Sequence, residues 1–174
     1  MKKLNNYIQE KLNLSTKHTC KPKTWTELKD IIRKRLKKDN NANLNDIDVS
    51  GIKDLSYLFD KLDPHNIDIS NWDVSNVTDM SCMFFCCENF NCDLSNWNVS
   101  NVEVISGMFE HCENFNSDLS GWDVSNVTNM YSMFSGCIRF NSDLNIWDVS
   151  NVTEMESMFK NCTSLKNRPK WYQN

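Results

Sequence analysis

The sequence predicts an α/β solenoid of about five strand-helix coils, each 25 residues long, behind a helical segment at the N-terminus. The stretch Trp72–Phe84 returns as 97–109, 122–134 and 147–159, each time 25 residues further on. A degraded copy occupies 47–59. Self-similarity at a fixed period of roughly 20 to 50 residues is typical of repeat architectures, in which each unit buries its apolar face against its neighbours.

Each copy contains two apolar patterns. Trp72 and Val74 alternate with Asp73 and Ser75, which predicts a short strand with one buried face. The residues that follow at i, i+3, i+4 and i+7 are Met80, Met83, Phe84 and Cys87. This spacing predicts a helix of two to three turns that faces the core. Because packed helices need more lateral room than paired strands, we expect the array to bend with its sheet on the concave side.

Three regions follow from these patterns. Residues 1–46 form a basic helical N-terminal cap, 47–165 form the repeats with coils starting near 47, 72, 97, 122 and 147, and 166–174 form a C-terminal cap. The formal charge separates the first two regions. Residues 1–46 hold twelve Lys and Arg against five Asp and Glu, giving +7, whereas 47–174 hold seven against eighteen, giving −11.

The N-terminal region predicts two helices. Leu4, Tyr7, Ile8 and Leu12 have helical spacing over 3–14, and Thr24 with Glu27 makes a capping box that opens a second helix reaching about Lys38. Its basic residues include Arg33, Lys34, Lys37 and Lys38. We interpret the second helix as an end cap with a solvated basic face. Binding of nucleic acid or of an acidic partner by these four residues remains the alternative.

The sequence argues against a membrane-spanning segment and against a catalytic or metal site. No segment is apolar enough to cross a bilayer, and the N-terminus lacks the apolar run of a signal peptide, so we expect a cytoplasmic protein. Cys87, Cys112, Cys137 and Cys162 recur at one repeat position and predict core residues, or stacked disulfides if the protein were exported. The group Cys82, Cys86, Cys87 and Cys92 lacks zinc-knuckle spacing. We predict no metal, no cofactor and no enzyme.

One position of the repeat is acidic in four of the five coils, and it has both a structural and a functional interpretation. Its members, one per coil, are Asp48, Asp73, Asn98, Asp123 and Asp148. We interpret them as capping a turn or helix, with a bound cation such as calcium or a basic partner as alternatives. Two further columns predict turn formers: Asn76, Asn101, Asn126 and Asn151, and Asp68, Asp93, Asp118 and Asp143.

The pattern Phe-Asn-x-Asp-Leu-Ser-x-Trp-Asp-Val-Ser-Asn-Val-Thr-x-Met-x-x-Met-Phe, as in 115–134, resembles the BspA-like leucine-rich repeat of bacterial surface proteins and lipoproteins. The resemblance covers about 45–165, and Lys21–Leu28 is similar to the helical head that precedes these repeats, including in phage-encoded members. It implies a right-handed, curved, leucine-rich-repeat-like solenoid that binds macromolecules and has no catalytic residues. The chain departs from surface-exposed members because no export signal or anchor is visible.

These observations favour a non-enzymatic module that binds a protein partner, with a phage-encoded protein acting on a host protein as one form of it. The alternatives are a nucleic-acid-associated regulator acting through the basic head and an exported surface adhesin. The contacts we predict vary between the copies or belong to the acidic column and basic head: Phe85, Glu110, Ser135, Lys160, Ser81, Ser106, Tyr131, Glu156, Asp73, Asp123, Asp148, Arg33, Lys34, Lys37 and Lys38. The oligomeric state is left open.

Overall fold

The computed structural model describes residues 18–173, and its one helix within that range is α2, Trp25–Lys38. The predicted helix over 3–14 lies outside the described residues. The second predicted helix is confirmed, with the Thr24 hydroxyl accepting from the Glu27 N–H at 3.2 Å. Glu27 reaches back one residue further than a capping box requires, and its carboxylate accepts from the Lys23 N–H at 2.7 Å.

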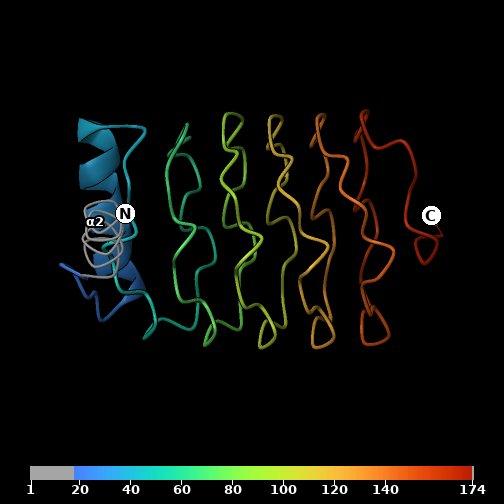
Figure 1. Cartoon of the computed structure of the whole chain (residues 1–174), viewed down its shortest axis with the longest axis horizontal. Coiled ribbons are helices and arrows are strands. Elements are labelled where there is room, and N and C mark those ends of the chain that lie inside the picture. The colour runs from blue at the N-terminus through green and yellow to red at the C-terminus, as the bar shows by residue number, and fades with distance from the viewer. Residues whose placement is uncertain (1–17, 174) are drawn as a thin grey trace, which may run out of the picture.

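After α2 the chain forms a stack of layers, each about 25 residues long (Figure 1). Isolated parallel bridges join equivalent residues of successive layers and so fix their order: Asp54, Asp79, Val104, Asn129 and Glu154. Helix α2 lies at one end of this row and the C-terminus at the other (Figure 1). The layers are therefore in register at a spacing of 25 residues.

The predicted α/β architecture of strand-helix coils is wrong. Among residues 18–173 there is one helix, α2, and the bridges are single pairs that do not extend into strands. Residues 72–74 have no regular structure, and 81–86, where a helix was predicted, form consecutive turns. The expected curvature had depended on helices on one side and strands on the other, so it loses its basis as well.

Two hydrogen-bond patterns explain the turns. In one layer the N–H groups of Met80, Cys82, Phe84 and Cys86 donate to carbonyls of the following layer at 2.9–3.0 Å. The N–H groups of Met83 and Cys87 instead donate three residues back within their own layer, at 3.2 and 3.0 Å. Cys82 and Cys86 have positive φ values of 51° and 56°, which an α-helix excludes. Turns that repeat every four residues bury the same i, i+3, i+4 and i+7 positions as a short helix, which accounts for the incorrect prediction.

The core runs along the stack as columns of equivalent side chains. Neighbouring rings in the column Phe59, Phe84, Phe109, Phe134 and Phe159 have centroids 5.1–5.7 Å apart and nearly parallel planes. All five are at most 2% exposed, and burial of each phenyl group stabilises the fold by about 1.5–3 kcal/mol. The apolar columns recognised in the sequence are thus core residues, although the backbone that carries them differs from the prediction.

Polar side chains of the repeat also join adjacent layers. The indole N–H of each core tryptophan donates to a carbonyl of the preceding layer, as Trp122 does to Leu94 at 3.0 Å. The amide of Asn101 donates to the Ser75 carbonyl at 2.7 Å, and Asn76, Asn126 and Asn151 repeat this bond. The most constant polar residues of the repeat therefore join adjacent layers. Few of their hydrogen-bonding groups remain for a ligand.

Candidate interaction surface

The stacked turns present one continuous face, which we call the turn face. It comprises four columns, 56–156, 57–157, 60–160 and 61–161, with one member in each layer at steps of 25 residues. Most of these residues are exposed or half-buried, whereas Gly107, Ser132, Ser135 and Gly136 are buried. The second and fourth columns have positive φ throughout: Tyr57, Cys82, Gly107, Ser132 and Ser157, and Lys61, Cys86, His111, Gly136 and Asn161. The residue types in the four columns vary from layer to layer more than those of the core do.

The structure brings the predicted contacts that vary between copies onto this face. Tyr131 is 49% exposed, Lys160 and Glu156 are exposed, and Phe85 and Glu110 are half-buried. Phe85, Glu110, Ser135 and Lys160 fall in the segments of each copy that were predicted to be helical, and that prediction is wrong because all four lie on turns. Ser81 and Ser106 are also half-buried, whereas Ser135 is 5% exposed and offers little surface.

Side chains on the turn face lie over the next layer. The Phe85 ring meets the His111 ring edge-on, with centroids 6.4 Å apart. A Cβ atom built on Gly107 would lie 3.0 Å from the Cys82 Sγ, and one built on Gly136 would lie 2.7 Å from the His111 Nδ1. The two glycines thus leave room for Cys82 and His111. Tyr57, which was not among the predicted contacts, is 50% exposed and is the first residue of the second column.

The carboxylates of the acidic column accept hydrogen bonds within turns of their own layer. Asp73 accepts from the Ser75 N–H at 3.1 Å and from its hydroxyl at 2.6 Å, and Asp123 repeats both bonds with Ser125. Asp148 accepts from the Ser150 N–H at 3.0 Å. Hydrogen bonds from these serines lower the pKa of the Asp123 and Asp148 carboxyls. Among the described residues, no group of three His, Cys, Asp or Glu side chains is arranged to hold a metal ion.

The four basic residues of α2 lie in solvent. Arg33, Lys34, Lys37 and Lys38 are exposed, and Arg33 lies 3.8 Å from Asp30. Two other cations of the helix point toward the layers instead: Lys29, 5% exposed, donates to the Tyr57 carbonyl, and Arg35 pairs with Asp46. The basic surface is therefore smaller than the charge of the segment suggests.

The cysteine column forms hydrogen bonds between layers. The thiols of Cys87, Cys112, Cys137 and Cys162 donate to phenylalanine carbonyls of the preceding layer at 2.9–3.3 Å. Every cysteine is free. Burial raises the pKa of all four thiols, that of Cys162 to about 12, so they stay protonated and unreactive at neutral pH.

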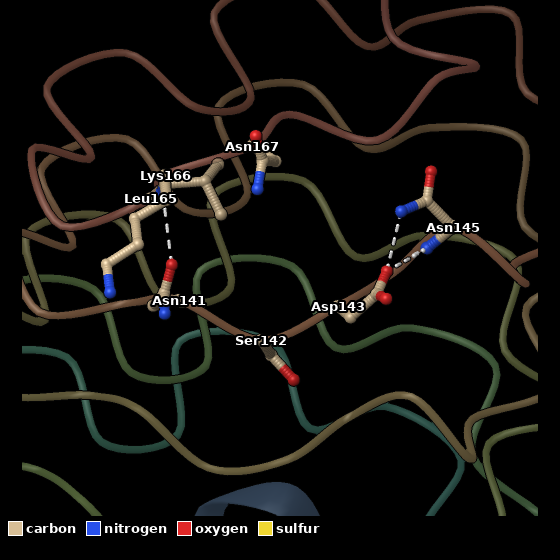
Figure 2. A pocket seen from close by; sticks show the side chains of 7 residues that line it. All are labelled: Asn141, Ser142, Asp143, Asn145, Leu165, Lys166 and Asn167. Atoms are coloured by element: carbon tan, nitrogen blue, oxygen red, sulfur yellow. Dashed lines mark hydrogen bonds between the residues drawn. The ribbon is translucent and has the colours of Figure 1, made fainter.

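A polar hollow lies near the C-terminal end, where the last two layers meet (Figure 2). In it, the Asp143 carboxylate accepts from the N–H and the amide of Asn145 at 2.9 and 2.7 Å, and Asn141 accepts from the Lys166 N–H at 3.1 Å. Its other lining residues are Ser142, Leu165 and Asn167. These bonds shape turns and join layers, as equivalent bonds do elsewhere in the stack, so the hollow has no distinct chemistry.

The chain matches the model of a known protein family. The family described as "Mycoplasma protein of unknown function, DUF285" matches residues 26–125 and 102–174, which together span α2 and all the layers. No curated protein and no solved structure matches the chain. Within residues 18–173 no helix has the length and apolar character needed to cross a bilayer.

Proposed function

We propose that this chain, which belongs to the DUF285 family of Mycoplasma proteins of unknown function, is a non-enzymatic module that binds a protein partner through the turn face. We also propose that its repeats are related to the BspA-like leucine-rich repeats that they resemble. The observation that carries the function is that, within each layer, the constant side chains make contacts between layers, whereas most of the variable side chains of the turn face are exposed or half-buried.

Two aromatic side chains support this choice of surface. Tyr57 and Tyr131 are 50% and 49% exposed on the turn face, and Phe85 is half-buried between them in the layer order. Aromatic residues dominate the energetics of protein interfaces because they bury large areas with little loss of side-chain entropy. The positions around them in the four columns of the turn face carry acidic, basic and small residues. Such a mixed set suits recognition of a folded protein surface rather than of a polymer with one repeating unit.

The test is a pull-down in which the full chain captures a partner from cells of the organism that makes it. Variants change either turn-face residues or an exposed residue outside the turn face. We expect Phe85→Ala combined with Tyr131→Ala to weaken retention of the partner about tenfold or more, since an interface hot spot contributes roughly 1.4 kcal/mol or more. Ile146→Ala is the matched control, because Ile146 is 78% exposed and lies outside the turn face. Equal retention by all variants would exclude the turn face, and the absence of any retained protein would refute the module.

A second candidate function is nucleic-acid binding by Arg33, Lys34, Lys37 and Lys38, which α2 holds together in solvent. Replacement of all four by Glu should abolish salt-dependent binding of duplex DNA, because release of counterions supplies most of such affinity. Electrophoretic mobility at several salt concentrations measures this. Binding that is absent in the wild type, or unchanged in the variant, removes the candidate.

A further inference from the structure

The first four layers, counted from α2, each present one aromatic or imidazole ring on the turn face. Tyr57, Phe85, His111 and Tyr131 belong to successive layers, and the two tyrosines are 50% and 49% exposed. The fold does not require rings at these positions, because the same columns carry small residues in other layers: Ser106, Gly107, Ser132, Ser135 and Gly136. The packing of the layers therefore does not explain the rings.

The rings and thiols of the first three layers lie together. A hydrogen bond between the Tyr57 hydroxyl and the Cys82 thiol of the next layer raises the pKa of the tyrosine. The Phe85 ring meets the His111 ring of the third layer edge-on. Cys82, Phe85 and Cys86 are half-buried, and His111 is exposed. We call this group the ring–thiol patch: Tyr57, Cys82, Phe85, Cys86 and His111.

Carboxylates lie beside the ring–thiol patch. Burial raises the pKa of the Cys82 and Cys86 thiols, and the nearby Glu110 carboxylate adds to the shift of both. The turn segments of the second and third layers, 79–88 and 104–113, each contain two acidic residues and no Lys or Arg. These acidic residues are Asp79, Glu88, Glu110 and Glu113. None of the four forms a salt bridge with a residue that the structure describes, so their charges are free to attract a partner.

The acidic charge is strongest in the layers that hold the ring–thiol patch. The turn segment of the first layer, 54–63, holds three acidic residues against Lys61, giving −2, which equals the charge of each of the next two segments. Segment 129–138 holds no charged residue, and 154–163 holds two acidic residues against Lys160, giving −1. The exposed rings and the negative potential thus coincide. An apolar patch beside carboxylates favours a partner whose apolar side chains are flanked by Lys and Arg.

The spacing of the layers matches the pitch of an α-helix. Neighbouring rings of the buried phenylalanine column, which lies beneath the turn face, have centroids 5.1–5.7 Å apart. An α-helix advances about 5.4 Å per turn, so a helix lying along the row of layers (Figure 1) places one turn on each layer. Its side chains at i, i+4 and i+7 then contact successive layers. In an extended chain, side chains on one face recur only about every 6.6 Å and drift out of register with the layers.

We propose that the turn face binds a basic amphipathic α-helix of a protein partner, which lies along the row of layers with one helical turn on each layer. Apolar side chains of this helix contact the ring–thiol patch and Tyr131, and its Lys and Arg side chains lie over the carboxylates beside the patch. The inference rests on the proposed function, because it names the kind of partner that the turn face recognises.

The probe is a fluorescein-labelled peptide of Leu and Lys, about 18 residues or roughly five helical turns long, with Leu at every third or fourth position. Its binding to the full chain is measured by fluorescence anisotropy, and we expect saturable binding. A peptide of the same composition in scrambled order has the charge without the apolar stripe, so it should bind about tenfold more weakly or less. Equal binding of the two peptides would show attraction by charge alone and would overturn the proposal, as would no binding of either.

Two variants of the chain test the rings and the carboxylates separately. Phe85→Ser should weaken binding of the Leu and Lys peptide about tenfold, since an aromatic anchor is lost. The fold has serine in the same column at Ser135. Glu88→Gln with Glu110→Gln should weaken binding about threefold or more, because exposed ion pairs each contribute modestly. Thermal melts check that the variants fold, and the glutamine variant still tests the site if the serine variant does not.

The matched control is Asp123→Asn with Asp148→Asn. It removes the same charge from the acidic column, outside the turn face. The chain tolerates asparagine in this column, because Asn98 accepts from the Ser100 N–H and hydroxyl as the aspartates do from their serines. Binding of the peptide should stay unchanged in this control. Equal weakening by the control and by the glutamine variant would mean that net charge, and not the turn face, holds the peptide.

Photo-cross-linking measures how the peptide lies. Benzophenone groups placed at the two ends of the apolar stripe should attach to different layers, and attachment of both ends to one layer would overturn the proposed orientation. The pull-down separates this inference from the function on which it rests. If a partner is retained through the turn face while the Leu and Lys peptide does not bind, the proposed function stands and this inference is refuted. If the peptide binds the turn face but no partner is retained, the helix site stands and the proposed function is refuted.

Discussion

The Cys112 thiol donates a hydrogen bond to the Phe84 carbonyl oxygen, 3.0 Å away in the preceding layer. The same carbonyl also accepts from the Cys87 N–H at 3.0 Å, within its own layer. One backbone oxygen thus joins a turn to the next layer. The cysteine at this position is both a small apolar core residue and a donor, which explains why it recurs amid methionine and phenylalanine.

The thiols should differ in reactivity. In the folded chain at mildly alkaline pH, we expect iodoacetamide to modify half-buried Cys82 and Cys86 before buried Cys112 and Cys137. The nucleophile is the thiolate, and burial raises the pKa of Cys112 well above its ordinary value. Peptide mass spectrometry over a time course measures the order. Simultaneous modification of all four residues without unfolding would contradict the predicted burial.

The tryptophan column should contribute strongly to stability. Trp122→Phe removes the bond to the Leu94 carbonyl and part of a side chain that is 4% exposed, so we expect a loss of about 1–3 kcal/mol in the free energy of unfolding. Urea denaturation followed by circular dichroism measures it. Trp171→Phe is the matched control. Trp171 makes the equivalent bond but is half-buried in the last layer, so a smaller loss is expected there.

Glycine substitutions should separate backbone strain from crowding. Gly136 has a φ of +76° and little room beside His111, so Gly136→Ala should destabilise the chain by about 1 kcal/mol or more. Gly121→Ala meets nothing within 4 Å and should be close to neutral. Adding His111→Ala to Gly136→Ala should recover only the part due to crowding. If the double variant recovered the full melting temperature of the wild type, the left-handed backbone conformation at position 136 would not destabilise the chain when alanine adopts it.

The junction between head and layers should respond to acid. The guanidinium of Arg35 is the largest cause that lowers the pKa of Asp46 from 3.8 to about 2. Because the folded pKa lies below the unfolded one, this stabilisation is complete above about pH 4 and is lost as pH falls toward 2. Arg35→Gln should lower stability at neutral pH and flatten the dependence over this window. Urea midpoints at successive pH values test this, and an unchanged slope would exclude the pair as its source.

Part of the fold is predictable from the residues alone. The helix from Thr24 to Lys38 follows from local signals, a capping residue and an apolar stripe, and the structure has it. The buried columns are predictable because a 25-residue repeat places equivalent side chains on top of one another. Tyr131 and Lys160 were predicted to be contacts because they vary between the copies, and both side chains are exposed.

The backbone of each layer was not predictable in this way. Apolar residues at i, i+3, i+4 and i+7 mark a face that repeats every 3.6 residues in a helix, and two four-residue turns bury the same set. The deciding groups are the N–H groups of Cys82 and Cys86, whose acceptors lie in another layer. The local sequence pattern does not indicate which distant backbone carbonyls these N–H groups contact.

By itself, the sequence determined the 25-residue register of this protein, the residues that form its core and the helix that covers its first layer. Only the tertiary structure decided that each layer is built of turns rather than a strand and a helix, and which layer supplies the acceptor for each backbone N–H group. The physical reason is that side-chain burial follows from periodicity, whereas a backbone hydrogen bond depends on which chain segment lies alongside.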